Sequence, residues 1–140
     1  MTRKETAQLK KDFWAHYLKR YPSAPFPSRF QEGKPYSNPW FLLRNRDIAV
    51  KLWHGSVSVG VYVTGSPERL APYREQFDKI TNYYLPKEAP QTAIYANTFR
   101  AEDTYDPQNW DKLVDFLEAY RRKYLEILTP SPDDAVTITT

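Results

Sequence analysis

Residues 47–63 constrain the fold more than any other stretch, because aliphatic residues alternate there with small or polar ones. This period of two is the pattern of β-strands. The aliphatic residues of the two arms are Ile48, Val50 and Leu52, then Val57, Val59, Val61 and Val63. Between the arms, His54 and Gly55 predict a two-residue turn, since Gly adopts positive φ freely and His tolerates it better than most residues. The stretch therefore predicts a β-hairpin.

The predicted turn also sets a register for the hairpin. Counting outward from it gives the pairs Trp53–Ser56, Leu52–Val57, Lys51–Ser58, Val50–Val59 and Ile48–Val61. Every aliphatic residue then faces another aliphatic residue, and a slip by one residue would destroy that match. The hairpin therefore has one apolar face, which another part of the chain must cover.

Three helices are expected around this hairpin. Residues 4–20 carry apolar side chains at helical spacing, and Pro22 ends that helix. A Ser-Pro-Glu start at residue 66 predicts a short turn, followed by the main second helix over residues 72–84. An Asp-Pro pair opens the last helix, which we expect over residues 106–128.

Residues 40–44 and 92–99 predict two more strands. The proline-dense segment between the first helix and the first strand predicts an extended connection, pinned by Phe26, Phe30 and Tyr36. The order helix, strand, strand, strand, helix, strand, helix predicts an α+β class. We expect a small antiparallel sheet of about four strands, built on the central hairpin and packed by the three helices.

The composition limits the domain count and the chemistry. The chain has 140 residues, which fits one domain, and it has no Cys. We expect that domain over residues 1–128 and a flexible tail over residues 129–140. No apolar run approaches the roughly 18 residues of a membrane span, and the charged N-terminus does not resemble a signal peptide. We therefore expect a cytoplasmic protein without disulfides, Cys-based zinc sites or a membrane partner.

Charge is distributed unevenly along the chain. Residues 1–51 hold 11 Lys and Arg against 4 Asp and Glu, whereas residues 52–140 hold 9 against 13. The two parts could neutralise each other across the folded surface. Alternatively, the N-terminal third could form a basic face.

No convergent catalytic set is found in the sequence. His16 lies within the first predicted helix and His54 at the predicted turn, and no spacing argues for a Ser-His-Asp set. Glu32-Gly33-Lys34 matches the Glu-x-Lys of many metal-dependent nucleases, but in those enzymes the pair lies on a sheet strand rather than among prolines. Phosphate-binding glycine loops are absent. We therefore expect no catalytic residues.

A group of acids near the last helix could supply oxygen ligands for Mg²⁺ or Ca²⁺. Its members are Glu102, Asp103, Asp106, Asp111 and Asp115. The simpler interpretation is that Asp106 caps the helix and that acids gather at helix starts because the helix dipole favours them there. We therefore expect no metal and no cofactor.

The candidate binding surface is the polar face of the hairpin. It carries Lys51, Trp53, Ser56, Ser58 and Tyr62, and the candidate binding residues are Arg44, Arg46, Lys51, Trp53, His54 and Tyr62. Three interpretations stay open: a helix covers this face and Trp53 belongs to the core, the face binds a protein, or it binds single-stranded nucleic acid. The polar neighbours of Trp53 favour its partial exposure.

Several segments carry a resemblance to a known family. They are Phe13-Trp14 with Tyr17, Val59–Val63, Ala93-Ile94-Tyr95, and Asn109-Trp110-Asp111 with Phe116-Leu117. Over residues 10–128 the chain resembles a bacterial domain of unknown function that is often appended to predicted restriction-endonuclease-like proteins. The resemblance implies an accessory module, with no catalytic residues to carry over, in bacterial defence against foreign DNA.

These observations predict a non-catalytic interaction module that binds a protein partner or a second copy of itself, in a bacterial or phage defence-related system. The alternative is a protein that binds or processes nucleic acid through the basic and aromatic hairpin face.

Overall fold

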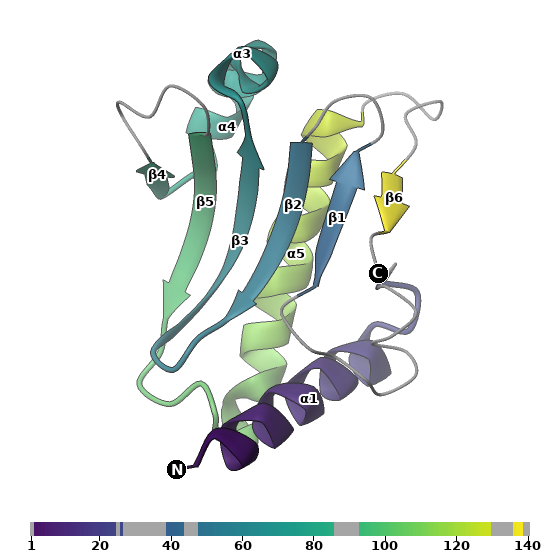
Figure 1. Ribbon diagram of the computed structural model, residues 1–140, viewed down its shortest axis with the longest axis vertical. Helices are drawn as coiled ribbons and strands as arrows, with labels where there is room; N and C mark the ends of the chain where they lie inside the picture. The colour runs from purple at the N-terminus through teal and green to yellow at the C-terminus, as the bar shows by residue number, and fades with distance from the viewer. Residues whose placement is uncertain are drawn as a thin grey trace.

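The computed structural model describes residues 2–24, 26, 39–43, 48–85, 93–129 and 136–138. The fold is α+β, with one antiparallel sheet in the strand order β4-β5-β3-β2-β1-β6 (Figure 1). The elements are α1 (Arg3–Arg20), β1 (Trp40–Leu43), β2 (Ile48–His54), β3 (Ser58–Gly65), α3 (Pro67–Leu70), a 3-10 turn (Ala71–Tyr73), α4 (Arg74–Asp78), β4 (Tyr83–Leu85), β5 (Ala93–Arg100), a second 3-10 turn (Pro107–Asn109), α5 (Trp110–Leu128) and β6 (Val136–Ile138).

The two long helices begin and end close to their predicted bounds, and a side-chain cap stands at or just before the first turn of each. Thr2 caps α1, and its hydroxyl accepts from the Glu5 N–H at 3.1 Å. Asp106 opens the turn before α5 by accepting from the Gln108 N–H at 3.0 Å. Each cap satisfies a backbone donor that the first turn of a helix leaves without an internal partner.

The hairpin forms at the centre of the sheet, but its register differs from the predicted one. The observed pairs are Ala49–Thr64, Val50–Val63, Lys51–Tyr62, Leu52–Val61, Trp53–Gly60 and His54–Val59. Each residue of β2 therefore pairs four residues further along the second arm than predicted. Because a shift by four is even, every side chain of β2 and β3 stays on its predicted face.

The turn of the hairpin is correspondingly longer than two residues. The Gly55 N–H donates to the Ser58 carbonyl at 2.8 Å, and Val57, predicted to pair with Leu52, is 52% exposed in the loop. His54 lies at the end of β2 instead of at the tip, and its side chain is fully buried. The two-residue turn was wrong because a period of two cannot distinguish registers that differ by an even number.

The described residues form a sheet of six strands, where about four were predicted. The two strands that the sequence missed, β4 and β6, have only three residues each. Such short segments show too little alternation to be found from the sequence. Strand β6 pairs antiparallel with β1 and lies within residues 129–140, the segment predicted to be a flexible tail. At residues 136–138 the tail prediction is therefore corrected.

The second helix is also shorter than predicted, since residues 67–78 form α3, the 3-10 turn and α4, and β4 follows. Asn82 explains the change. Its backbone N–H donates to the Ala96 carbonyl at 2.9 Å, while its side-chain amide bonds both main-chain groups of Thr98 at 2.8 and 2.9 Å. These bonds fix residue 82 at the sheet edge and satisfy part of the open edge of β5.

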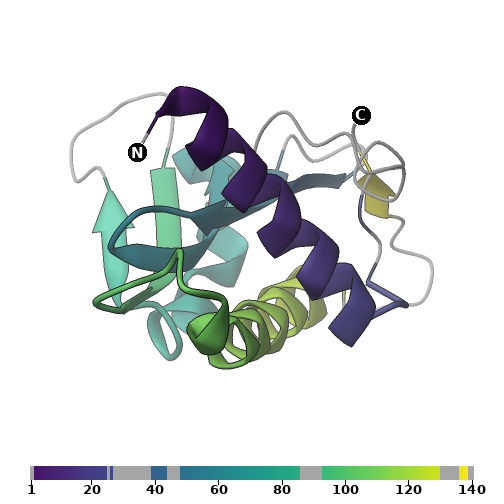
Figure 2. The ribbon, with the colours of Figure 1, turned by 90° about the horizontal axis from the view of Figure 1, so that it is seen from below.

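The core lies between the sheet and α5, which runs behind the sheet in Figure 1. Seen from below in Figure 2, α1 crosses the end of the sheet and reaches α5. The fully buried side chains from these layers include Phe13 and Tyr17 of α1, Val50, Leu52, Val61 and Val63 of the hairpin, and Leu113, Val114 and Leu117 of α5. Phe26 is buried too, as predicted, whereas Phe30 and Tyr36 lie outside the described residues. Within the described part of the chain, no helix combines the length and the apolar character needed to cross a membrane.

We expect Val50→Asp to unfold the domain, because Val50 is 0% exposed and an unpaired carboxylate there would cost on the order of several kcal/mol. Ser56→Asp is the control, since it adds the same charge in the exposed loop of the hairpin. Melting temperatures of the two variants test the assignment of the faces. Similar melting temperatures would mean that the inner and outer faces of the hairpin are reversed.

Candidate functional site

The face of the sheet that points away from α5 gathers three of the predicted binding residues. Strand register places Lys51 opposite Tyr62, and Trp53 opposite Gly60. The same register continues onto β5, where Ser58 pairs with Arg100. We call this surface, formed by Lys51, Trp53, Ser58, Gly60, Tyr62, Thr98 and Arg100, the outer face.

Trp53 is 40% exposed on this face, so the interpretation that it belongs to the core was wrong and its predicted partial exposure is confirmed. The indole packs over Gly55, where an added Cβ would lie 2.5 Å from Trp53 Nε1. Tyr62 leans over Gly60 in the same way, where a Cβ would lie 3.0 Å from Tyr62 Cε2. The two glycines therefore let both aromatic rings lie close to the backbone of the sheet.

Basic residues surround these rings. Lys51 and Arg100 are exposed, and the Lys10 ammonium of α1 lies 5.5 Å from the centre of the Trp53 ring. That distance allows a cation–π interaction. None of the six described strands contains Asp or Glu, so the strands bring no negative charge to the outer face. The outer face is thus aromatic at its centre and basic around it.

The other predicted binding residues do not join this surface. Arg44 and Arg46 lie outside the described residues. His54 is on the inner face, because the observed register makes it the last inward-pointing residue of β2. The residues missed by sequence reasoning are Lys10 and Arg100, which lie far from the hairpin in the chain and reach it only through the packing of α1 and the pairing of β5.

His54 instead joins the buried cluster that connects α1, β2 and α5. Its ring stacks on Phe13 with centroids 3.9 Å apart, and its Nε2–H donates to the Thr104 carbonyl at 2.8 Å. The same carbonyl accepts from Trp110 Nε1 at 3.0 Å. Because a carbonyl only accepts, the proton sits on Nε2 of a neutral imidazole. Burial lowers the pKa of His54 to about 4, which keeps the ring uncharged at neutral pH.

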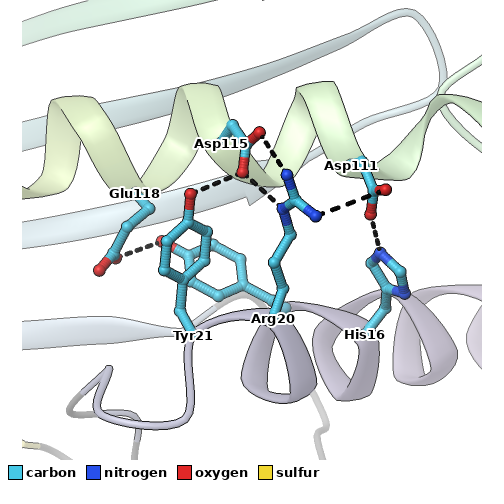
Figure 3. Close-up of polar contacts among 7 residues, drawn as sticks. His16, Arg20, Tyr21, Asp111, Asp115 and Glu118 are labelled. Carbon is cyan, nitrogen blue, oxygen red and sulfur yellow. Dashed lines mark hydrogen bonds and ion pairs between the residues drawn. The ribbon is translucent and has the colours of Figure 1, made fainter.

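The second polar assembly joins α1 to α5 (Figure 3). His16 contacts Asp111 at 2.7 Å, and Arg20 binds both oxygens of Asp115 at 2.6 and 2.8 Å. The Tyr21 hydroxyl donates to Asp115 at 2.6 Å. The Arg20 guanidinium holds the pKa of the Asp115 carboxyl below its ordinary value. These contacts use two of the acids that could have served as metal ligands.

Deeper in the same interface, Glu118 is 2% exposed and Arg121 is 8% exposed. Arg121 donates to both Glu118 oxygens at 2.6 and 2.8 Å, and the Tyr17 hydroxyl donates at 2.9 Å. Burial alone would raise the pKa of Glu118, but the bonds from Arg121 and Tyr17 hold it below its ordinary value. Burial, with the Glu118 carboxylate beside it, raises the pKa of Tyr17 far above its usual range. Tyr17 therefore keeps its proton at neutral pH, and Glu118 remains a fully bonded carboxylate.

Two of the remaining acids of the candidate metal group, Asp103 and Asp106, have local structural partners. Asp103 accepts from the N–H groups of Tyr105 and Asp106, both at 3.1 Å. In the part of the chain that the structure describes, no three His, Asp or Glu side chains gather as metal ligands. Glu32 and Lys34, the possible nuclease pair, lie outside that part.

Comparisons of the chain with protein-family models, with curated protein sequences and with solved structures find no match. The resemblance to the defence-associated domain therefore stays a prediction.

We expect the stability that depends on neutral His54 to be lost as the pH falls from about 6.5, its unfolded pKa, through about 4, its folded pKa. The loss should reach at most about 3 kcal/mol, at roughly 1.4 kcal/mol per pKa unit. His54→Phe keeps a flat aromatic ring but cannot be protonated. The deficit in the free energy of unfolding of this variant relative to the parent should therefore shrink as the pH falls through this interval. Thermal unfolding of both proteins in a His16→Gln background, which removes the other histidine, measures the difference. A deficit that is independent of pH would contradict the assignment.

We expect Glu118→Ala to destabilise the domain by about 3–5 kcal/mol, because it leaves the Arg121 guanidinium buried without its carboxylate. Glu126→Ala, on an exposed position of the same helix, should cost less than about 1 kcal/mol. Urea unfolding of the two variants compares them. Equal losses would show that the buried Glu118–Arg121 ion pair within α5 does not stabilise the domain.

Proposed function

We propose that this protein is a non-catalytic interaction module that binds its partner through the outer face. The observation that carries the proposal is the 40% exposed Trp53, which shares the sheet face opposite α5 with Tyr62, Lys51 and Arg100 and lies 5.5 Å from the Lys10 ammonium of α1. A large aromatic residue held in place by packing and left partly open to solvent is typical of the central residues of binding interfaces.

The polar groups of the interior support binding over catalysis. Tyr17 and Glu118 are hydrogen-bonded within the helix interface, and burial keeps His54 neutral between Phe13 and Thr104. A general base or nucleophile has to reach a substrate. The described titratable groups that are strongly perturbed by burial face other side chains of the domain, so their geometry suits stability.

The partner predicted from the sequence is another protein or a second copy of this chain. Trp, Tyr and Arg, which the outer face contributes as Trp53, Tyr62 and Arg100, are the residue types enriched in protein interfaces. A role in bacterial or phage defence rests on the family resemblance alone. The same residue types also occur on surfaces that bind nucleic acid, the alternative partner.

We expect Trp53→Ala to abolish partner capture while changing the free energy of unfolding by only about 1 kcal/mol, because the side chain is partly exposed. Tagged parent and variant proteins are compared for the protein and nucleic acid that they retain from an extract of the native host, and light scattering reports self-association. Val57→Ala is the control, since Val57 is 52% exposed in the hairpin loop. A strict monomer that retains nothing, or a Trp53→Ala variant that retains as much as the parent, would contradict the proposal.

A further inference from the structure

The charge of the outer face indicates the chemistry of its partner. Lys51 lies on β2, Arg100 lies at the end of β5, and Lys10 reaches the same face from α1. The six described strands contain no Asp or Glu, so the charged side chains that the strands themselves bring to this face are cationic. The described acids of the nearby loop are partly engaged, as Asp103 accepts from two backbone N–H groups. A surface of this kind complements a polyanion.

The aromatic residues at the centre indicate more than charge. Trp53 and Tyr62 lie on the two central strands and are diagonal neighbours, since Tyr62 comes two residues after the partner of Trp53. Diagonal neighbours on adjacent strands lie roughly 7–8 Å apart, so the two side chains form one aromatic area on this face. Gly55 and Gly60 keep the rings low on the sheet. Two low rings surrounded by cations can stack unpaired bases while the cations contact phosphates.

We infer that the outer face binds single-stranded nucleic acid, with bases against Trp53 and Tyr62 and phosphates at Lys10, Lys51 and Arg100. This inference rests on the proposed function, because it names the partner of the same surface. In a duplex the bases are stacked on each other and present no free face to the rings, so a duplex can use only the cations. An acidic protein would likewise use the cations but would leave the rings without stacking partners. The aromatic pair therefore favours the single strand.

The inference predicts both affinity and salt dependence for an oligonucleotide probe. Fluorescence anisotropy is measured with labelled ten-nucleotide oligothymidine and oligouridine, an oligothymidine–oligoadenine duplex of the same length, and a polyglutamate peptide. We expect the single strands to bind at least about 10-fold more tightly than the duplex or the peptide. Three phosphate contacts, at a slope of roughly 0.7 each for single strands, should give a plot of log K against log salt with a slope of about −2.

Variants then separate stacking from charge. Trp53→Ala should weaken single-strand binding about 10-fold or more with little change in the salt slope, since it removes a stacking surface. Lys51→Ala and Arg100→Ala should each lower the slope by about 0.7, because each removes one phosphate contact. Val57→Ala and Lys112→Ala are the matched controls, as both residues are exposed away from the outer face, and both should bind like the parent. Melting temperatures confirm that each variant is folded.

The outcomes distinguish this inference from the proposed function. If no oligonucleotide binds at low salt, but the parent retains a protein or a second copy that Trp53→Ala loses, then the outer face is a protein interface and only the nucleic-acid inference is overturned. Equal binding of duplex and single strand, or binding that Trp53→Ala leaves unchanged, also overturns it, because stacking is then not used. If neither oligonucleotide nor host partner depends on Trp53, both proposals fail.

Discussion

The structure depends on the burial of the inner face of the β2–β3 hairpin beneath α5. Val50, Leu52, Val61 and Val63 are all 0% exposed, and they meet an apolar stripe of α5 that includes Leu113, Val114 and Leu117. Burial of such side chains is the main driving force of folding. This burial also determines which residues lie on the other face of the sheet, because a strand that turns its apolar residues inward presents the alternate residues to the other side. The outer face is therefore formed by the residues that alternate with the buried ones.

The position of α1 follows from a different kind of contact. Phe13, Trp14 and Tyr17 of this helix are buried, and Leu9 and Leu18 pack against the core. Polar contacts to α5 come from His16, Tyr17 and Arg20 and from the C-cap residue Tyr21 (Figure 3). Directional ion pairs and hydrogen bonds set the placement of a helix more narrowly than apolar packing alone. Since α1 crosses the end of the sheet, its first half reaches the hairpin and brings Lys10 to Trp53. The helix interface therefore contributes to the composition of the outer face.

Periodic patterns in the sequence predict the face on which a strand residue lies, but they do not predict its pairing partner. Alternation identified the inward and outward residues of the hairpin correctly, helical spacing and Pro22 located α1, and the Asp-Pro pair at residue 106 located the turn that opens α5. The same alternation could not set the register, since Val50 finds a valine partner at either position 59 or 63. His54 was consequently placed at a turn instead of in the core. Short strands and the side-chain bonds of Asn82 depend on contacts between distant residues, which no local pattern contains.

Only part of the candidate surface could be predicted from the sequence. Lys51, Trp53 and Tyr62 belong to one hairpin, so alternation places them on one face whatever the register. Lys10 and Arg100 come from other elements, so only the tertiary fold brings them there.

The division of polar groups between the two sides of the sheet supports the proposal that the outer face carries the function. On the inner side, the ionisable groups pair with each other: Glu118 with Arg121, and Asp115 with Arg20. The Glu118–Arg121 pair is buried, so removing either partner leaves an uncompensated charge, and neither group can also serve a ligand without loss of stability. On the outer side, Trp53 is partly exposed next to cations without a carboxylate on the strands. A partly exposed indole adds little to the stability of the domain. Its position beside positive charge agrees with the proposal that a partner covers it.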